Sequence, residues 1–325
     1  MPAPRTSAKT AAPPARPTLA FERLKTYPVA RRHSKVNTQL FAKPLPKGAS
    51  FQEYFDSLPE ILAARDVRAI AVAIVAAHRA KKTVLFMMGA HVIKCGLSPL
   101  LIDLLERRVV TALAMNGAGI IHDFELAFAG QTSEEVDTAL EDGSFGMAEE
   151  THRILNGAIV DGAREGWGLG EAIGRMINAQ KLPHRSLSVL ATCQRLGVPA
   201  TIHVAVGTDI IHQHASADGA AIGQTSLRDF RRLAEVVSTL NGGVVGNLGS
   251  NVILPEVFLK AVSIGRNLGF PVRDFTAFDF DMIRHYRPRE NVLRRPTKSG
   301  GKAYAITGHH ELLIPLLAHA VVELL

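Results

Sequence analysis

Residues 109–125 read VVTALAMNGAGIIHDFE, and this stretch decides the fold. An apolar run of strand length (109–115) is followed by a turn of small residues (116–119) and a helical pattern (120–128). A buried strand that enters a helix through such a turn is typical of nucleotide sites in α/β proteins, because a ligand can approach the backbone and the free N–H groups of the helix. The full GxGxxG spacing is absent, so an ordinary strand-to-helix turn is the alternative interpretation.

The regions on both sides of this stretch alternate between strand-like and helix-like patterns. Strands are expected at residues 82–88, 109–115, 200–206, 243–245, 274–280 and 303–306. Helices are expected at residues 51–58, 61–79, 97–107, 120–128, 133–141, 147–163, 169–180, 186–196, 226–240, 255–267 and 309–325. Such alternation is typical of parallel sheets with right-handed crossovers. The sequence therefore predicts one α/β domain over residues 51–325, with a doubly wound, mostly parallel, Rossmann-like sheet and helical decoration.

The first fifty residues differ in composition from the rest. Residues 1–20 are rich in Pro, Ala and Thr, which predicts a disordered tail, and residues 21–50 are basic and interrupted by prolines, which predicts an extended arm. No apolar run is long enough to span a bilayer, and the N-terminus lacks the apolar segment of a signal peptide. Two cysteines, Cys95 and Cys193, are too few for a disulfide framework, so we expect a cytoplasmic protein.

The formal net charge of +7 would suit an anionic partner. Much of this charge is local, because basic residues gather in the first 35 residues and in a late loop at residues 281–302. No pattern of base-stacking aromatic residues accompanies them. We therefore expect neither a nucleic acid nor a membrane as partner.

Polar residues follow several of the predicted strands. Because the carboxyl ends of parallel strands share one edge, where α/β sheets bind ligands, we expect these residues to gather there. They are His91, Asn116, Gly117, His122, Asp123, Thr208, Asp209, His212, His214, Gly246, Asn247, Asp279, Asp281, His309 and His310. Imidazole and carboxylate groups suit zinc, iron or manganese, so one hypothesis is a metal site. Its ligands would come from His122, Asp123, Asp209, His212, His214, His309 and His310. No HExxH motif or cysteine pair supports this hypothesis, and the site that we predict contains no metal.

Four segments resemble the deoxyhypusine synthase family, in the same order, between residues 83 and 325. They are NGAGIIHDFE, DGSFGMAEETHRILNGAIV with its R-x-x-NG, the glycine-rich NGGVVGNLGSN, and TGHHELLIPLLAHAV near the end. The resemblance implies a tetrameric Rossmann-like enzyme that binds NAD and takes a hydride from a polyamine. It further implies that an aminobutyl group passes through an imine on a lysine to an acceptor lysine of a protein.

Several positions depart from the family pattern. Ile121 and His122 replace an acidic pair, residues 246–248 (Gly-Asn-Leu) replace Lys-His-His, and His309 replaces an aspartate. We therefore expect NAD-dependent transfer of an aminoalkyl group from a polyamine to a small amine rather than to a protein lysine. A metal-dependent enzyme and a non-catalytic protein of the same fold are the alternatives.

The resemblance and the position of residues after strands together assign individual roles. NAD is expected to contact Gly89, Asn116, Gly117, Ala118, Gly119, Gly242, Gly243 and His309. The polyamine is expected to contact His122, Asp123, Asp209 and Asn247 through charge-assisted hydrogen bonds. The predicted imine-forming residue is Lys298 in the late basic loop, with Lys302 as the second candidate; the neighbouring Arg294 and Arg295 would lower the pKa of Lys298.

Overall fold

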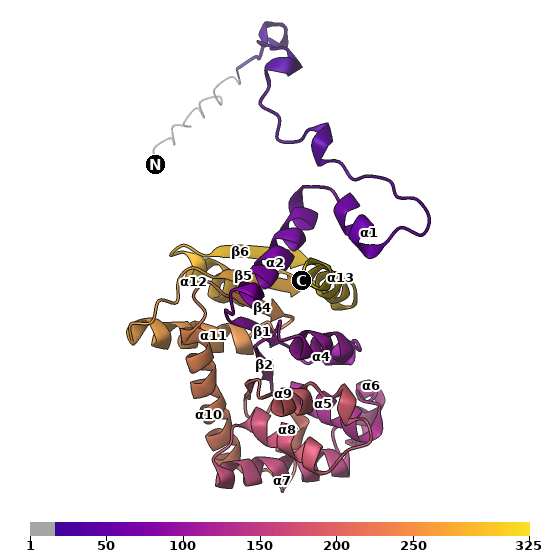
Figure 1. Cartoon of the computed structure of the whole chain (residues 1–325), viewed down its shortest axis with the longest axis vertical. Helices are drawn as coiled ribbons and strands as arrows, with labels where there is room; N and C mark the ends of the chain where they lie inside the picture. Colours follow the sequence, from indigo (N-terminus) through magenta and orange to yellow (C-terminus); the bar gives the residue numbers. More distant parts are fainter. Residues whose placement is uncertain (1–16) are drawn as a thin grey trace, which may run out of the picture. The chain divides into compact units, whose positions relative to one another are not determined.

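The computed structural model describes residues 17–325 (Figure 1). The chain divides into two units, Met1–Phe41 and Ala42–Leu325. The described part of the first unit contains three short 3-10 helices with no buried residue, at Phe21–Arg23, Val29–Arg31 and Thr38–Leu40. Most of the predicted tail, residues 1–16, lies outside the described residues.

The second unit is built on one sheet of six strands. The strands are β1 (Val84–Met88), β2 (Ala112–Asn116), β3 (Ala200–His203), β4 (Val244–Leu248), β5 (Thr276–Asp281) and β6 (Lys302–Thr307). Their order is β3-β2-β1-β4-β5-β6 and every neighbouring pair is parallel. This is the strand order of the doubly wound fold, in which the direction of winding reverses between β1 and β4. The predicted fold class is confirmed.

Alternate residues of the strands face two separate apolar layers, because successive side chains of a strand point to opposite faces. On one face, Phe86, Phe278 and Phe280 pack among the residues of the larger core. That face is covered by α2 (Leu62–Arg79), α4 (Ser98–Glu106), α5 (Ala118–Ala129) and α13 (His310–Leu324). On the other face, Met87 and Val245 pack against α10 (Gly219–Ser238), α11 (Ile253–Asn267) and the π-helix Pro288–Arg294.

The remaining helices decorate this sheet. They are α1 (Phe51–Ser57), α3 (His91–Lys94), α6 (Val136–Asp142), α7 (Glu149–Glu165), α8 (Leu169–Ala179), α9 (Val189–Leu196) and α12 (Arg295–Thr297). Figure 1 shows α5 to α9 gathered together, on the side of the sheet where β2 lies. Helices α7, α8 and α10 pack against one another, and α8 and α10 also contact β3. Helix α8 approaches the amino end of β3, where a Cβ on Gly170 would lie 2.2 Å from the Ala200 carbonyl oxygen, whereas the start of α7 lies near the carboxyl ends of β2 and β3.

Several boundaries differ from those expected from the sequence, among them the end of β3, which is His203 rather than residue 206. Residues 246–248 belong to β4 rather than to a glycine-rich loop, because they pair with β1 on one side and with β5 on the other. Helix α10 begins at Gly219, where Asp218 caps it, seven residues before the predicted start. The predicted loop at residues 281–302 contains the π-helix and α12, so the crossover from β5 to β6 is largely helical.

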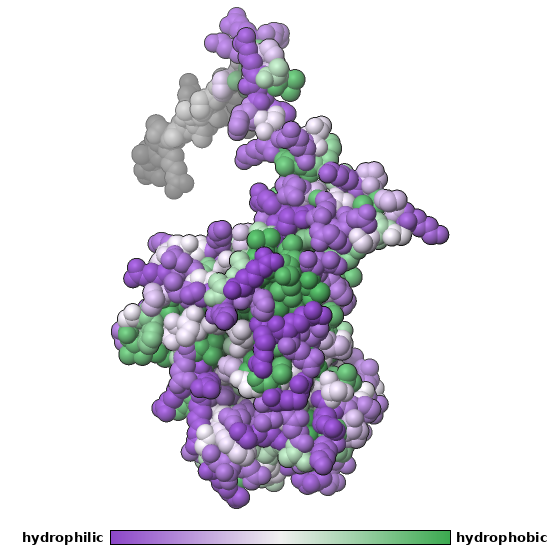
Figure 2. Space-filling model, in the orientation of Figure 1, coloured by the Kyte–Doolittle hydropathy of each residue, from purple (hydrophilic) through white to green (hydrophobic). Residues whose placement is uncertain are grey.

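The surface mixes polar and apolar residues. Figure 2 shows hydrophobic residues over the region of α2, where Leu62 and Val72 are 74% and 51% exposed. Within residues 17–325, no helix combines the length and apolarity that a bilayer crossing requires.

Candidate functional site

A cavity of about 630 Å³ lies at the carboxyl ends of β2 and β3. Its charged side chains are Lys94, Glu125, Glu134, Glu150 and Asp209. Apolar side chains complete the wall, among them Ile121, Phe128, Val136, Phe145 and Ile210. Because four carboxylates face one ammonium group, we call this space the acidic cavity.

One face of α5 lines the acidic cavity. Ala118, Ile121, His122, Glu125 and Phe128 all contribute to its wall. They recur every three or four residues, which is the spacing of side chains on one face of a helix. The residues between them, Ile120, Phe124 and Ala127, are buried in the core. The sequence of α5 therefore separates a cavity face from a packing face.

A chain of hydrogen bonds fixes Glu125. The Thr132 hydroxyl donates to Glu125 Oε2 at 2.5 Å, and the Thr151 hydroxyl donates to Oε1 at 3.0 Å. His122 Nδ1 lies 2.7 Å from Thr132 Oγ1, which accepts a hydrogen bond because its own proton is given to Glu125. Burial lowers the pKa of His122, so the ring is neutral, with its proton on Nδ1. The carboxylate of Glu125 is thus held in a fixed orientation in the wall.

Asp209 lies over the start of α5. A Cβ atom on Gly117 would stand 1.9 Å from Asp209 Oδ2, so only glycine leaves room for this carboxylate. The N-terminus of a helix favours negative charge, and here a protein carboxylate provides that charge. A phosphate of NAD at the same turn would meet like charge. The residues present therefore do not fit a phosphate of NAD at the predicted contacts Asn116–Gly119, although Ala118 lines the cavity and Gly117 lies against Asp209, which also lines it.

We expect Gly117→Ala to displace Asp209, because the added methyl group would overlap its carboxylate. The expected cost is roughly 1–3 kcal/mol of unfolding free energy, together with weaker binding of any ligand that contacts Asp209. Gly157→Ala is the matched control, since Gly157 lies inside α7 with no atom near its missing side chain. That control should be neutral or stabilising by about 0.5–1 kcal/mol. Chemical denaturation measures both, and equal stabilities of the two variants would contradict the overlap.

A second group of predicted residues lies at the carboxyl ends of β1 and β4, where the strand order reverses. It includes Gly89, Asn247 and His310. A Cβ on Gly89 would lie 2.6 Å from the Gly249 carbonyl oxygen, and the space beside Gly249 is filled by the His310 ring. His310 Nε2 lies 2.9 Å from the Phe280 carbonyl oxygen, which can only accept, so Nε2 donates and, in the neutral ring, Nδ1 is an acceptor. Asn247 Nδ2 donates to the Ser250 carbonyl oxygen and to Asp279 Oδ1.

Several acceptor atoms at this edge are buried and unpaired. Within the described part of the chain, Asn247 Oδ1, Asp281 Oδ2 and His310 Nδ1 have no hydrogen-bond partner. Buried polar atoms are normally paired, so unpaired acceptors indicate a place for donors from a ligand or from water. Burial and the neighbouring Asp281 raise the pKa of Asp279 to about 6.

Asp123, predicted to bind the polyamine, does not line the acidic cavity. Its carboxylate accepts hydrogen bonds from Ser188 Oγ at 2.6 Å, Val189 N at 2.8 Å and Leu190 N at 3.2 Å. It therefore caps α9 from inside the core, fully buried. Adjacent residues of a helix point about 100° apart, so His122 and Asp123 could not both face the cavity.

Lys298, Gly242 and Gly243 do not line the acidic cavity either. Lys298 is exposed and stands four residues before β6, and Gly243 immediately precedes β4 beside Thr83. Because every strand runs in the same direction, residues before a strand lie at the amino edge, opposite the acidic cavity. The second candidate, Lys302, is the first residue of β6 and lies at the same edge.

The last two predicted cofactor residues have other surroundings. A Cβ on Gly119 would lie 3.1 Å from Met115, so this glycine serves the packing of α5 on β2. His309 follows β6 at the carboxyl edge, exposed, with Nδ1 3.7 Å from Glu311. Neither residue lines the acidic cavity.

The proposed metal ligands do not converge. Asp123 is used in the cap of α9, and His214 Nε2 is 2.9 Å from the Gly146 carbonyl oxygen. Across residues 17–325, no three His, Cys, Asp or Glu side chains come together in an arrangement that could hold a metal ion. The histidines lie along one edge of the sheet, but they do not meet at one position.

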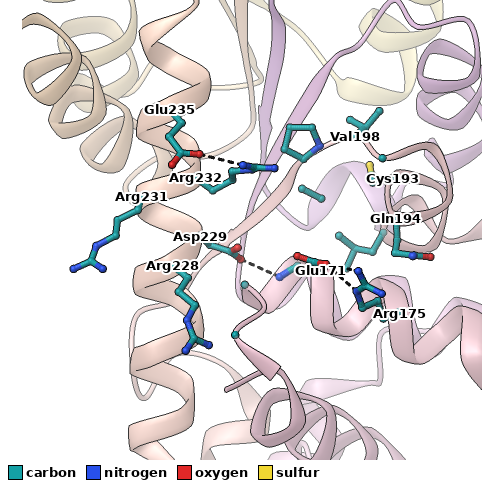
Figure 3. A pocket seen from close by; sticks show the side chains of 17 residues that line it. Glu171, Arg175, Cys193, Gln194, Val198, Arg228, Asp229, Arg231, Arg232 and Glu235 are labelled. Carbon is teal, nitrogen blue, oxygen red and sulfur yellow. Dashed lines mark hydrogen bonds and ion pairs between the residues drawn. The ribbon is translucent and has the colours of Figure 1, made fainter. Parts of the chain in front are cut away.

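A separate cavity of about 460 Å³ lies at the amino end of β3 (Figure 3). Its charged groups are largely paired within the protein. Arg175 lies 2.7 Å from Glu171, Arg232 lies 3.1 Å from Glu235, and Asp229 accepts from the Gly170 and Ile202 amides. Arg228 donates to three carbonyl oxygens at the end of α7 and just beyond it. These contacts explain the cluster as structural, so the acidic cavity remains the candidate site.

Sequence reasoning missed Lys94, Glu125, Thr132 and Thr151. Glu125 could have been found, because it lies three residues after His122 on the same face of a predicted helix. Lys94 lies in the short helix after β1, where a residue after a strand is expected at the carboxyl edge. Thr132 and Thr151 carry no comparable signal, since their approach depends on the fold of residues 130–151.

Comparisons with known proteins support the fold. No protein-family model matches the chain, and no curated protein sequence matches it. Among solved structures, a protein of Entamoeba histolytica assigned as a deoxyhypusine synthase is 13% identical, with a TM-score of 0.52 over 87% of this chain and 96% of that one. A protein of Methanococcus maripaludis assigned as a LOR/SDH protein is also 13% identical, with a TM-score of 0.51 over 82% and 71% of the two chains.

A third structure contains a cofactor. AgrE in complex with ornithine and NAD+ is 14% identical, with a TM-score of 0.51 over 80% of this chain and 33% of AgrE. The chain thus spans about a third of AgrE, and likewise of the cyanobacterial arginine dihydrolase ArgZ. At these identities the likeness shows the fold. The deoxyhypusine synthase-like fold expected from the sequence is confirmed.

Proposed function

We propose that this chain is an NAD-linked enzyme that oxidises a small cationic amine held in the acidic cavity. The charge of the cavity carries the proposal, because Glu125, Glu134, Glu150 and Asp209 outnumber the single ammonium group of Lys94. Carboxylates bind ammonium groups through charge-assisted hydrogen bonds. Between these charges, apolar side chains such as Phe128 and Phe145 suit the methylene chain of a diamine or polyamine.

The cofactor part of the proposal draws on the fold and on the unpaired acceptors. An AgrE structure of this fold is a complex with NAD+. The acceptors Asn247 Oδ1, Asp281 Oδ2 and His310 Nδ1 fit donors of the kind that ribose hydroxyls and a carboxamide offer. NAD, when bound, supplies the hydride acceptor. Glu125 binds and orients the substrate ammonium group, and the apolar wall excludes water from its carbon chain.

The test separates the amine from the cofactor. Calorimetry with 1,4-diaminobutane, spermidine and agmatine, each without NAD, measures the amine site alone, and a titration with NAD measures the cofactor site alone. Incubation with both should then produce NADH and an oxidised amine that mass spectrometry identifies. If no cationic amine binds, the proposal is wrong, and a non-catalytic protein of this fold becomes the better description.

Aminoalkyl transfer through a lysine imine is a second candidate, and the position of Lys94 favours it. Lys94 lines the acidic cavity, whereas Lys298 lies at the opposite edge of the sheet. Borohydride reduction in the presence of NAD and 1,4-diaminobutane should therefore label Lys94 covalently. Lys94→Arg should abolish the label, whereas Lys298→Arg should retain it. A label on Lys298 would instead require that a neighbouring subunit brings this residue to the site.

A homo-oligomer is part of the proposal. The apolar residues over α2, including Leu62 and Val72, form an exposed surface of the kind that subunit interfaces bury. The arm at residues 21–41 also exposes large side chains, with Phe21 and Tyr27 more than 60% accessible. Both features support association of several copies, the state that the family resemblance implies.

A further inference from the structure

We propose that Asp209 and His212 form the acid–base pair of the acidic cavity, with Asp209 exchanging a proton with the bound amine and His212 positioning the carboxylate. The inference rests on the proposed function of the cavity and assigns a step within it. Asp209 lines the cavity wall, and its side chain is only 5% exposed.

Within residues 17–325, one oxygen of the Asp209 carboxylate is left without a hydrogen-bond partner by the fold. This oxygen is Oδ2, which is buried. Glu125 differs in this respect, because both of its oxygens accept hydrogen bonds from threonine hydroxyls. A buried carboxylate oxygen without a donor costs stability, and such atoms are typical of functional sites. Glu125 is therefore suited to hold a positive charge, and Asp209 is the group free to accept a proton.

His212 is fixed as a donor directed at Asp209. Its Nδ1 atom accepts from the amides of Gly207 at 3.2 Å and Asp209 at 3.3 Å. The proton of the neutral ring is consequently on Nε2, which lies 3.9 Å from Asp209 Oδ2 and has no partner within the described chain. A shift of about 1 Å would turn this approach into a hydrogen bond. Burial lowers the pKa of His212, which favours the neutral donor.

The proton step is simple. A substrate ammonium group held by Glu125 gives one proton to Asp209, so an N–H bond breaks, an O–H bond forms, and the amine retains its lone pair. Burial raises the pKa of Asp209 to about 6, which narrows the gap to the pKa of an ammonium group. The other charged or titratable groups that face this space are Lys94, His122, Glu125, Glu134 and Glu150.

Two variants of His212 separate its chemistry from its structural contacts. His212→Asn places an amide oxygen near the position of Nδ1, so it can still accept from Gly207 and Asp209, but it lacks Nε2. His212→Gln reaches the position of Nε2 and retains a donor there. If His212 positions the carboxylate, His212→Asn should lower kcat by about 10- to 100-fold with little change in KM, and His212→Gln should recover part of the loss. A merely structural role predicts the opposite order.

Nuclear magnetic resonance of the ligand-free protein tests the pair without any substrate. The His212 ring should show the tautomer protonated on Nε2, and its shifts should follow the titration of Asp209 near pH 6. Asp209→Asn should remove that step. The Asn variant should also gain stability over wild type as the pH rises from 5 to 8. Burial raises the pKa of Asp209 in the folded protein, so ionisation of this carboxyl group lowers the free energy of unfolding of wild type as the pH rises. The amide of the Asn variant does not ionise and causes no such loss.

Calorimetry with 1,4-diaminobutane in two buffers of different ionisation enthalpy completes the test. Near pH 6, binding of the dication should release protons from wild type and fewer from Asp209→Asn. If the dication does not bind at all, the proposed function of the cavity fails, whereas the resonance experiment still decides the pair. If the dication binds without proton release and the His212 shifts do not follow the titration of Asp209, the proposed acid–base pair is wrong, whereas the proposed amine site is retained.

Discussion

Asp123→Ala is expected to lower the free energy of unfolding by about 3 kcal/mol, the largest stability effect that we predict for a single polar side chain. The variant leaves the Ser188 hydroxyl and the amides of Val189 and Leu190 without their acceptor inside the core. Each lost hydrogen bond costs about 1 kcal/mol, and buried donors cannot turn to water instead. Urea denaturation followed by circular dichroism measures the loss.

Asp218→Ala is the matched control for this prediction. Asp218 also caps a helix, accepting from the amides of Ala220 at 2.8 Å and Ala221 at 3.0 Å at the start of α10. This cap is at the surface, where water can replace the lost acceptor, so we expect a cost of about 1 kcal/mol. A similar small loss in Asp123→Ala would show that the buried cap contributes no more than an exposed one.

The architecture could be predicted because hydrophobic periodicity and the alternation of strands and helices are local in sequence. The predicted parallel topology itself already argued against Lys298 as a residue of the site. In a parallel sheet the chain must return to the amino edge before each strand, so a residue four positions before β6 could not lie with Asn116 and His122. Residues 281–302 were predicted to be a basic loop that carries the imine-forming lysine, but the topology places the end of that segment at the opposite edge.

The candidate site could be predicted only in part. The helical period of α5 already separates His122 and Glu125 from Asp123. By contrast, the contact of Asp209 with Gly117 joins residues about ninety positions apart, and no pattern within either segment specifies it. The threonines that hold Glu125 are similar, because Thr132 and Thr151 reach it from separate segments. Such long-range contacts determine whether a side chain is a cap, a wall or a free base.

Glu125→Gln is expected to produce the largest change in ligand binding. The substitution keeps the shape of the side chain and removes its charge. One threonine hydroxyl can keep donating to the amide oxygen while the other rotates to accept from the amide nitrogen, so the fold should be retained. A hydrogen bond to a charged group contributes about 1.5–3 kcal/mol, which corresponds to a loss of about 10- to 100-fold in affinity for 1,4-diaminobutane. Calorimetry at low ionic strength measures the dissociation constants.

The comparison with other acidic residues makes this expectation specific to the cavity. Glu134→Gln and Glu150→Gln remove exposed carboxylates from the cavity wall, where water screens the charge, so each should weaken binding by only about 2- to 5-fold, and added salt should reduce the difference. Glu135→Gln removes a neighbouring charge that does not line the cavity and should leave affinity unchanged. If Glu125→Gln bound the diamine as tightly as Glu135→Gln, the ligand would lie elsewhere. The excess of carboxylates around His122 would then have to be explained without an amine.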